Sequence, residues 1–146
     1  MRLQIVAYDR GPLNIPETIA PESLTYENVQ VRIAMLLRYK TDSGLLGAQF
    51  VIKYEKDETE TVAEIGMMFS VFLEGWAEFV QTNPAEEAII AYLRQDDQVF
   101  EKLIHAANAV VLERTKDTAV EKYFVPCQVD VDEFVANALR VVKDDE

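Results

Sequence analysis

Apolar and polar residues alternate with a period of two along three successive stretches of the chain. In the first stretch, Val29, Ile33 and Leu37 fall on one face, while Arg32 and Arg38 fall on the other. A period of two is typical of a β-strand, because successive side chains of a strand point to opposite sides. Short turn-forming segments separate the stretches, so the pattern predicts an antiparallel meander. The predicted long strands cover residues 29–40, 46–55 and 62–73, after a shorter strand over Leu3–Tyr8.

The period changes to that of a helix in the second half of the chain. The segment "NPAE" predicts a helix over residues 84–94 with Asn83 as its N-cap. An amphipathic stripe that includes Phe100 and Leu103 predicts a longer helix over residues 96–114. Residues 11–25, with three prolines, and residues 115–129 are expected to be irregular connections, the first packed on the surface.

The segment "DVDE" at residues 130–133 has the form of a capping box with Asp130 as N-cap, and it predicts a last helix whose apolar stripe ends at Leu139. Strands therefore come first and helices second. This order favours an α+β fold, in which a four-stranded antiparallel sheet is followed by a long amphipathic helix and a C-terminal helix. The length of the chain fits one domain over residues 1–146.

The run "EIGMMFSVFLEGWAEF" at residues 64–79 is apolar on both faces of the predicted strand. One face is expected to meet the helix stripe of residues 100–111. The other face must be covered by a loop such as residues 11–25, by another subunit or by a bound polypeptide. Large and adaptable side chains gather there. This candidate peptide-binding surface consists of Leu36, Val51, Met68, Phe72, Trp76 and Phe79.

Composition and charge narrow the class of partner. The chain has 26 acidic and 14 basic residues, a net charge of −12, and no basic cluster. These features argue against binding to nucleic acid, which depends on clustered Lys and Arg. The apolar run from Ile65 to Leu73 is too short to span a bilayer, so no membrane insertion is expected. The single cysteine and the absence of a signal-peptide pattern favour a cytoplasmic location.

The sequence contains no glycine-rich phosphate loop and no metal-ligand spacing. His105 is expected to be exposed on the polar side of its helix, and Cys127 to be a buried structural residue. A Cys127–His105 nucleophile–base pair has no flanking signature to support it. We therefore expect no enzyme activity, no catalytic residue, no cofactor and no metal.

Three segments carry a resemblance to a known family. They are "AEIGMMFSV" at residues 63–71, "VVLERTKDT" at 110–118 and "YFVPCQVDVDEFV" at 123–135. With the layout of strands and helices, they make residues 24–140 resemble the SecB family of export chaperones. The resemblance implies an ATP-independent chaperone that holds unfolded polypeptides in an apolar groove. It also implies a homodimer or homotetramer, and the acidic surface would suit a basic partner such as the translocase motor.

Two interpretations remain from the sequence. The first is a SecB-like holdase, or targeting factor, for unfolded or extended polypeptides. The second is a non-enzymatic structural or assembly adaptor, in which the second apolar face is buried in a stable homo-oligomer. They differ in whether apolar surface stays accessible after assembly. An enzyme of unknown reaction ranks behind both.

Overall fold

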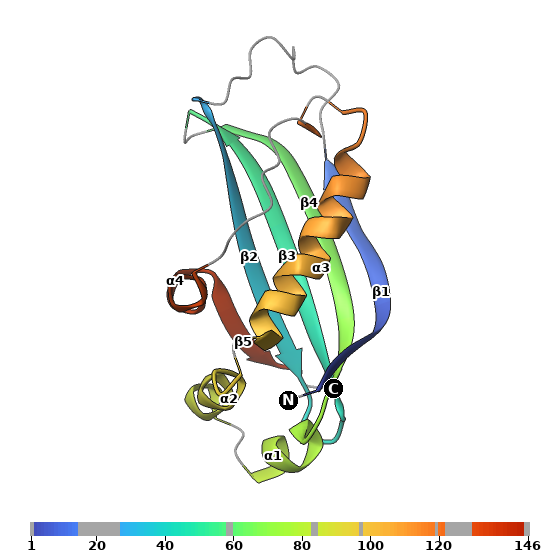
Figure 1. The fold of residues 1–146 in the computed structure, drawn as a ribbon, viewed down its shortest axis with the longest axis vertical. Coiled ribbons are helices and arrows are strands. Elements are labelled where there is room, and N and C mark those ends of the chain that lie inside the picture. Colours follow the sequence, from blue (N-terminus) through green and yellow to red (C-terminus); the bar gives the residue numbers. More distant parts are fainter. Residues whose placement is uncertain are drawn as a thin grey trace.

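A computed structural model describes residues 2–14, 27–57, 60–82, 85–96, 98–118, 120–121 and 130–144, with Pro12 and Asn14 described by their backbone alone. The fold is α+β, as predicted, with one mixed sheet; the longest helix crosses one face of it, and the shorter helices lie at its end and side (Figure 1). The sheet order is β1-β4-β3-β2-β5. The elements are β1 Leu3–Asn14, β2 Val29–Tyr39, β3 Leu45–Lys56, β4 Glu60–Leu73, α1 Trp76–Thr82, α2 Glu86–Leu93, α3 Gln98–Thr115, α4 Val131–Asn137 and β5 Leu139–Lys143.

The three long alternating strands are confirmed, each to within two residues of its predicted ends. β2 and β3 pair antiparallel without interruption from Val29↔Lys56 to Tyr39↔Leu46. β3 and β4 pair antiparallel along almost their whole length. The alternation determines which side chains lie on each face of the sheet. Every second residue is buried against the helices, and the residues between them point away.

β1 is longer than predicted, because residues 11–14 continue the strand rather than starting an irregular connection. A bulge between Arg10 and Leu13 shifts the register, after which Leu13 pairs with Ile65 of β4. The bulge places Gly11 so close to β4 that a Cβ atom there would lie 2.5 Å from the carbonyl carbon of Gly66. The alternation of the strand breaks at this point, which explains why the sequence pattern ended early. Residues 15–25 of the predicted connection lie outside the described part of the chain.

The fifth strand, β5, was not predicted, and it makes the sheet mixed instead of fully antiparallel. The sequence pattern assigned Leu139 to the last helix, but α4 ends at Asn137. The amide of Met35 then donates to the carbonyl oxygen of Ala138 over 2.8 Å, and β5 continues parallel to the second half of β2. Pairing with the edge of β2 satisfies backbone groups of that strand, which a further turn of α4 would leave without partners.

Helix α3 lies across one face of the sheet (Figure 1) and confirms the predicted long helix. Asp130 caps α4 as predicted, accepting hydrogen bonds from the amides of Asp132 and Glu133. The N-cap of α2 is Ala85, which has no side-chain hydrogen bond, so the expected cap at Asn83 was wrong. The reason is that the helix starts two residues later than the "NPAE" pattern indicates.

The core forms between the helix-facing side of the sheet and α3, as the pattern predicted. Ile65 of β4 and Phe100 of α3 are fully buried. Phe50 and Phe69, neighbours on β3 and β4, meet edge to face with ring centroids 6.0 Å apart. The large buried side chains of the core thus lie on this side of the sheet, and the opposite face points away from α3.

Candidate functional site

Four of the six predicted surface residues lie together on the sheet face that points away from α3. Leu36, Val51 and Met68 are half-buried, and Phe72 is 41% exposed. The strand registers place them in rows, with Gln49 between Leu36 and Met68. We call this side the open sheet face. It consists of the outward-pointing residues of the sheet, among them Gln4, Arg32, Ala34, Leu36, Arg38, Leu45, Gln49, Val51, Lys53, Glu64, Met68, Phe72 and Arg140.

The other two predicted residues, Trp76 and Phe79, do not belong to this face. Trp76 is completely buried at the start of α1, and its ring lies 6.1 Å from the ring of Tyr39 on the helix side of the sheet. Phe79 stacks on Tyr92 with a centroid distance of 4.0 Å. The strand ends at Leu73, so the alternation could not be extended to these positions.

A local signal for this helix was present in the sequence. Gly75 adopts a φ of 81°, a left-handed conformation that suits glycine and ends the strand. The spacing of Trp76, Phe79 and Val80 is that of a helix, and Trp76 and Val80 are its buried residues. Trp76 and Phe79 therefore close one end of the core, and no polypeptide can reach Trp76 without unfolding α1.

Tyr92 of α2 links this aromatic cluster to the strand end. Its hydroxyl donates to the carbonyl oxygen of Glu74 over 3.2 Å. Partial burial, reinforced by the carboxylates of Glu78 and Glu74, raises the pKa of the Tyr92 hydroxyl. The hydroxyl therefore stays protonated as a donor across the neutral range, and the cluster has a structural role.

Sequence reasoning missed Leu45, which extends the apolar area of the open sheet face. Leu45 is 44% exposed and lies directly opposite Phe72 in the β3–β4 register. It begins a strand directly after a turn, and this position hid its alternation from the pattern. Large apolar side chains with this exposure, placed side by side, are characteristic of a surface that contacts another molecule.

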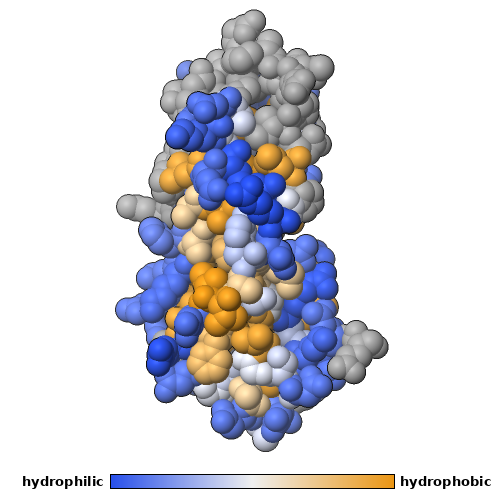
Figure 2. Space-filling model, turned by 90° about the vertical axis from the view of Figure 1, so that its right-hand side faces the viewer, coloured by the Kyte–Doolittle hydropathy of each residue, from blue (hydrophilic) through white to orange (hydrophobic). Residues whose placement is uncertain are grey.

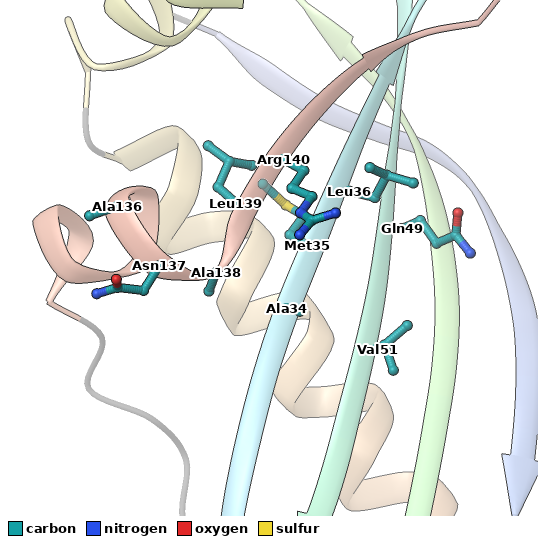
Figure 3. A pocket seen from close by; sticks show the side chains of 10 residues that line it. All are labelled: Ala34, Met35, Leu36, Gln49, Val51, Ala136, Asn137, Ala138, Leu139 and Arg140. Carbon is teal, nitrogen blue, oxygen red and sulfur yellow. The ribbon is translucent and has the colours of Figure 1, made fainter.

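A hollow of about 610 Å³ opens on the same face where β2 meets β5 (Figure 3). Small side chains make it hollow, because Ala34, Ala136 and Ala138 leave space beside the taller side chains of Leu36 and Arg140. A neighbouring depression of about 530 Å³ continues it along β2. The two share Ala34, Val51, Asn137 and Ala138.

Charges on this face are mostly paired. Arg38 donates to Asp144 over 3.1 Å and to Gln49 over 3.0 Å. Arg32 lies 3.4 Å from the carboxylate of Glu55. Two basic residues of the open sheet face form no ion pair with any residue that the structure describes. They are Arg140, beside Leu36 in the β2–β5 register, and Lys53, opposite Glu64 in the β3–β4 register.

A second apolar surface follows the outer edge of β1 (Figure 2). Among the described strands, β1 pairs only with β4, so its other side presents backbone groups outward. Leu112 of α3 adds an apolar side chain that is 49% exposed. The exposed apolar residues of β1 are Ile5, Val6, Tyr8 and Leu13, between 36% and 49% accessible. A long apolar edge of this kind is a template for pairing with another chain.

Among residues 2–14, 27–57, 60–82 and the other described segments, no three His, Cys, Asp or Glu side chains gather closely enough to hold a metal ion. No helix in the described part of the chain has the length and apolarity needed to cross a membrane. His105 is exposed on α3 as predicted, and Cys127 lies outside the described residues. Neither protein-family models nor curated proteins show a match to this chain.

Proposed function

We propose that this protein is an ATP-independent holdase of SecB-like type that binds unfolded or extended polypeptide on its open sheet face. The observation that carries the proposal is the apolar pair Leu45 and Phe72, 44% and 41% exposed, continuous with half-buried Leu36, Val51 and Met68. Such a face is costly to leave in water unless it contacts a partner. A cytoplasmic location is part of the proposal.

The chemistry of the face suits clients of varied sequence. Contacts with Phe72 and Leu45 are non-directional, and the unbranched thioether side chain of Met68 can adapt to different shapes. Burying a large apolar side chain contributes roughly 1.5–3 kcal/mol. A few such contacts give reversible binding without nucleotide, which is what a holdase needs. The acidic surface elsewhere on the chain, with a net charge of −12, leaves room for a basic translocase as a second partner.

The double substitution Met68→Ser and Phe72→Ser is expected to weaken client binding by about one to two orders of magnitude. Both side chains lie outside the core, so the melting temperature should fall only modestly. The measurement is suppression of aggregation of a denatured model protein without ATP, alongside melting curves. Lys102→Ser is the control, because Lys102 is exposed on the polar side of α3 and belongs to neither the open sheet face nor the β1 edge.

Two outcomes would contradict the holdase proposal. One is a wild-type protein that fails to suppress aggregation even at stoichiometric excess. The other is a double variant that suppresses aggregation as well as the Lys102→Ser control does. If the double variant instead unfolds or loses its oligomeric state, the face is an interface between subunits. The adaptor is then the better-supported function.

The β1 edge supports the second candidate, a structural or assembly adaptor that functions as a homo-oligomer. Two copies could join their β1 strands edge to edge and bury Ile5, Val6 and Leu13 together with Leu112 of α3. This contact would extend the sheet across the two copies. It leaves the open sheet face free, so oligomerisation through β1 is compatible with the holdase as well.

We expect the protein to be a homodimer or homotetramer, and Val6→Lys to shift it to the monomer. Val6 is 49% exposed on the outer edge of β1, where a charge opposes pairing of strands. Light scattering at micromolar concentration measures both forms, with Lys102 on the polar side of α3 changed to Glu as a control. A wild-type monomer under these conditions would rule out the expected oligomer.

A dye that fluoresces on apolar surface then separates the holdase from the adaptor, since only the holdase keeps such surface accessible.

A further inference from the structure

We propose that the hollow beside Arg140 selects client segments in which a carboxylate stands two residues from a large apolar side chain. The inference rests on the proposed holdase function and adds the class of client. It follows from the juxtaposition of an apolar hollow and a guanidinium that has no ion pair among the described residues, on one sheet face (Figure 3).

The hollow has room for a large apolar side chain. Its floor is Ala34, and the small residues Ala136 and Ala138 from the end of α4 form one wall. Leu36 and Val51 supply apolar contact on the sheet side. An aromatic or leucine side chain placed over Ala34 would replace water along these surfaces, and the gain scales with the apolar area covered.

The cation stands one row away along the strands. Arg140 is the partner of Leu36 in the β2–β5 register, and Leu36 is two residues from Ala34 on β2. Arg140 is exposed and forms no ion pair among the described residues, whereas the neighbouring Arg38 is neutralised by Asp144 at 3.1 Å. The excess positive charge at this end of the hollow therefore belongs to Arg140.

An extended client lying along β2 matches this spacing. Residues i and i+2 of an extended segment point to the same side, about 7 Å apart, which is the repeat of the strand below. A large apolar residue over Ala34 would bring the side chain two positions away next to Arg140. A carboxylate there can accept two hydrogen bonds from the guanidinium.

The opposite end of the hollow is expected to favour neither an acidic nor a basic client residue. Arg32 is paired with Glu55 at 3.4 Å, and Lys53 lies across from Glu64. These two basic and two acidic groups balance. The face is thus polarised, with a preference for an acidic client residue at the Arg140 end, although the whole chain carries a net charge of −12.

Six short fluorescent peptides test the proposal by anisotropy. All have a Gly/Ser background with one Phe, and the residue two positions before or after the Phe is Glu, Gln or Lys. Near physiological salt the Debye length is about 8 Å, so repulsion from the rest of the acidic chain is screened and the local contact is measured. The Glu peptides are expected to bind about three- to fivefold more tightly than the Gln peptides, with the Lys peptides weakest.

Variants assign the preference to one residue. Arg140→Gln should bring the Glu and Gln peptides to the same affinity without changing the Gln peptide, and Arg140→Glu should reverse the order in favour of Lys. Lys102→Glu is the control. It changes the charge as much as Arg140→Glu does, at an exposed residue of α3, and should keep the wild-type order of affinities. Arg140 is exposed on an edge strand, and melting curves check that each variant is folded.

The possible failures are distinguishable. If all peptides bind alike, or if Lys102→Glu changes the order as much as Arg140→Glu does, the client preference is wrong while the holdase stands. If no peptide binds and the wild type fails to suppress aggregation, the holdase fails and the preference fails with it. If Arg140→Glu instead disrupts the oligomer, a second copy occupies the hollow, and the preference is overturned.

Discussion

Replacement of Trp76 by alanine is expected to lower the free energy of unfolding by about 3–5 kcal/mol, the range for deletion of a large buried aromatic side chain. Trp76 is 0% exposed, and its ring contacts those of Tyr39, Phe79 and Tyr92 at centroid distances between 6.1 and 6.2 Å. The cavity left behind would separate α1 from the sheet end. Urea denaturation followed by circular dichroism measures the change.

Phe79→Ala is the natural comparison, because Phe79 stands in the same cluster but is only half-buried. It should destabilise clearly less than Trp76→Ala. Neither substitution should change the affinity of the folded protein for client peptides, since both residues lie away from the open sheet face. A Trp76→Ala variant that keeps its stability but loses client binding would restore the sequence-based assignment of Trp76 to the binding surface.

The alternating pattern predicted the sheet well wherever one face is buried and the backbone stays regular. Residues of β3 such as Ala48, Phe50 and Ile52 are fully buried, and the register depends on that side. The prediction failed where this condition ends. At Gly75 the chain turns into α1, and at Gly11 a bulge breaks the period within β1.

β5 could not be predicted from local sequence for a different reason. Leu139 and Val141 fit a helix stripe as well as a strand, and only the free edge of β2 selects the strand. The same pairing brings Arg140 next to Leu36. The apolar part of the candidate site, with Leu36, Val51, Met68 and Phe72, could therefore be predicted from the sequence. Its hollow, and the cation Arg140 that forms no ion pair with the described residues, could not.

Gly11→Ala is expected to destabilise the protein by about 3 kcal/mol or more, at the upper end for the insertion of a methyl group into a packed site. The added Cβ would lie 2.5 Å from the carbonyl carbon of Gly66, 2.7 Å from its oxygen and 2.9 Å from the amide nitrogen of Met67. All three are backbone atoms of a paired strand, so none can rotate aside. β1 must move off β4, and the hydrogen bond of 2.9 Å from Arg114 to the Gly66 oxygen lies at the same spot.

Gly47→Ala, on β3, provides the matched control. There the added Cβ would meet the terminal methyl of Met68 at 2.6 Å, but this tip belongs to a flexible side chain on the open sheet face and can swing away. We expect a loss of no more than about 1 kcal/mol. Urea denaturation measures both variants, and light scattering of Gly11→Ala shows whether displacement of β1 also removes the expected oligomer. Equal stability of the two variants would mean that β1 does not approach β4 at Gly66 as closely as the bulge requires, and the edge contact built on β1 would lose its basis.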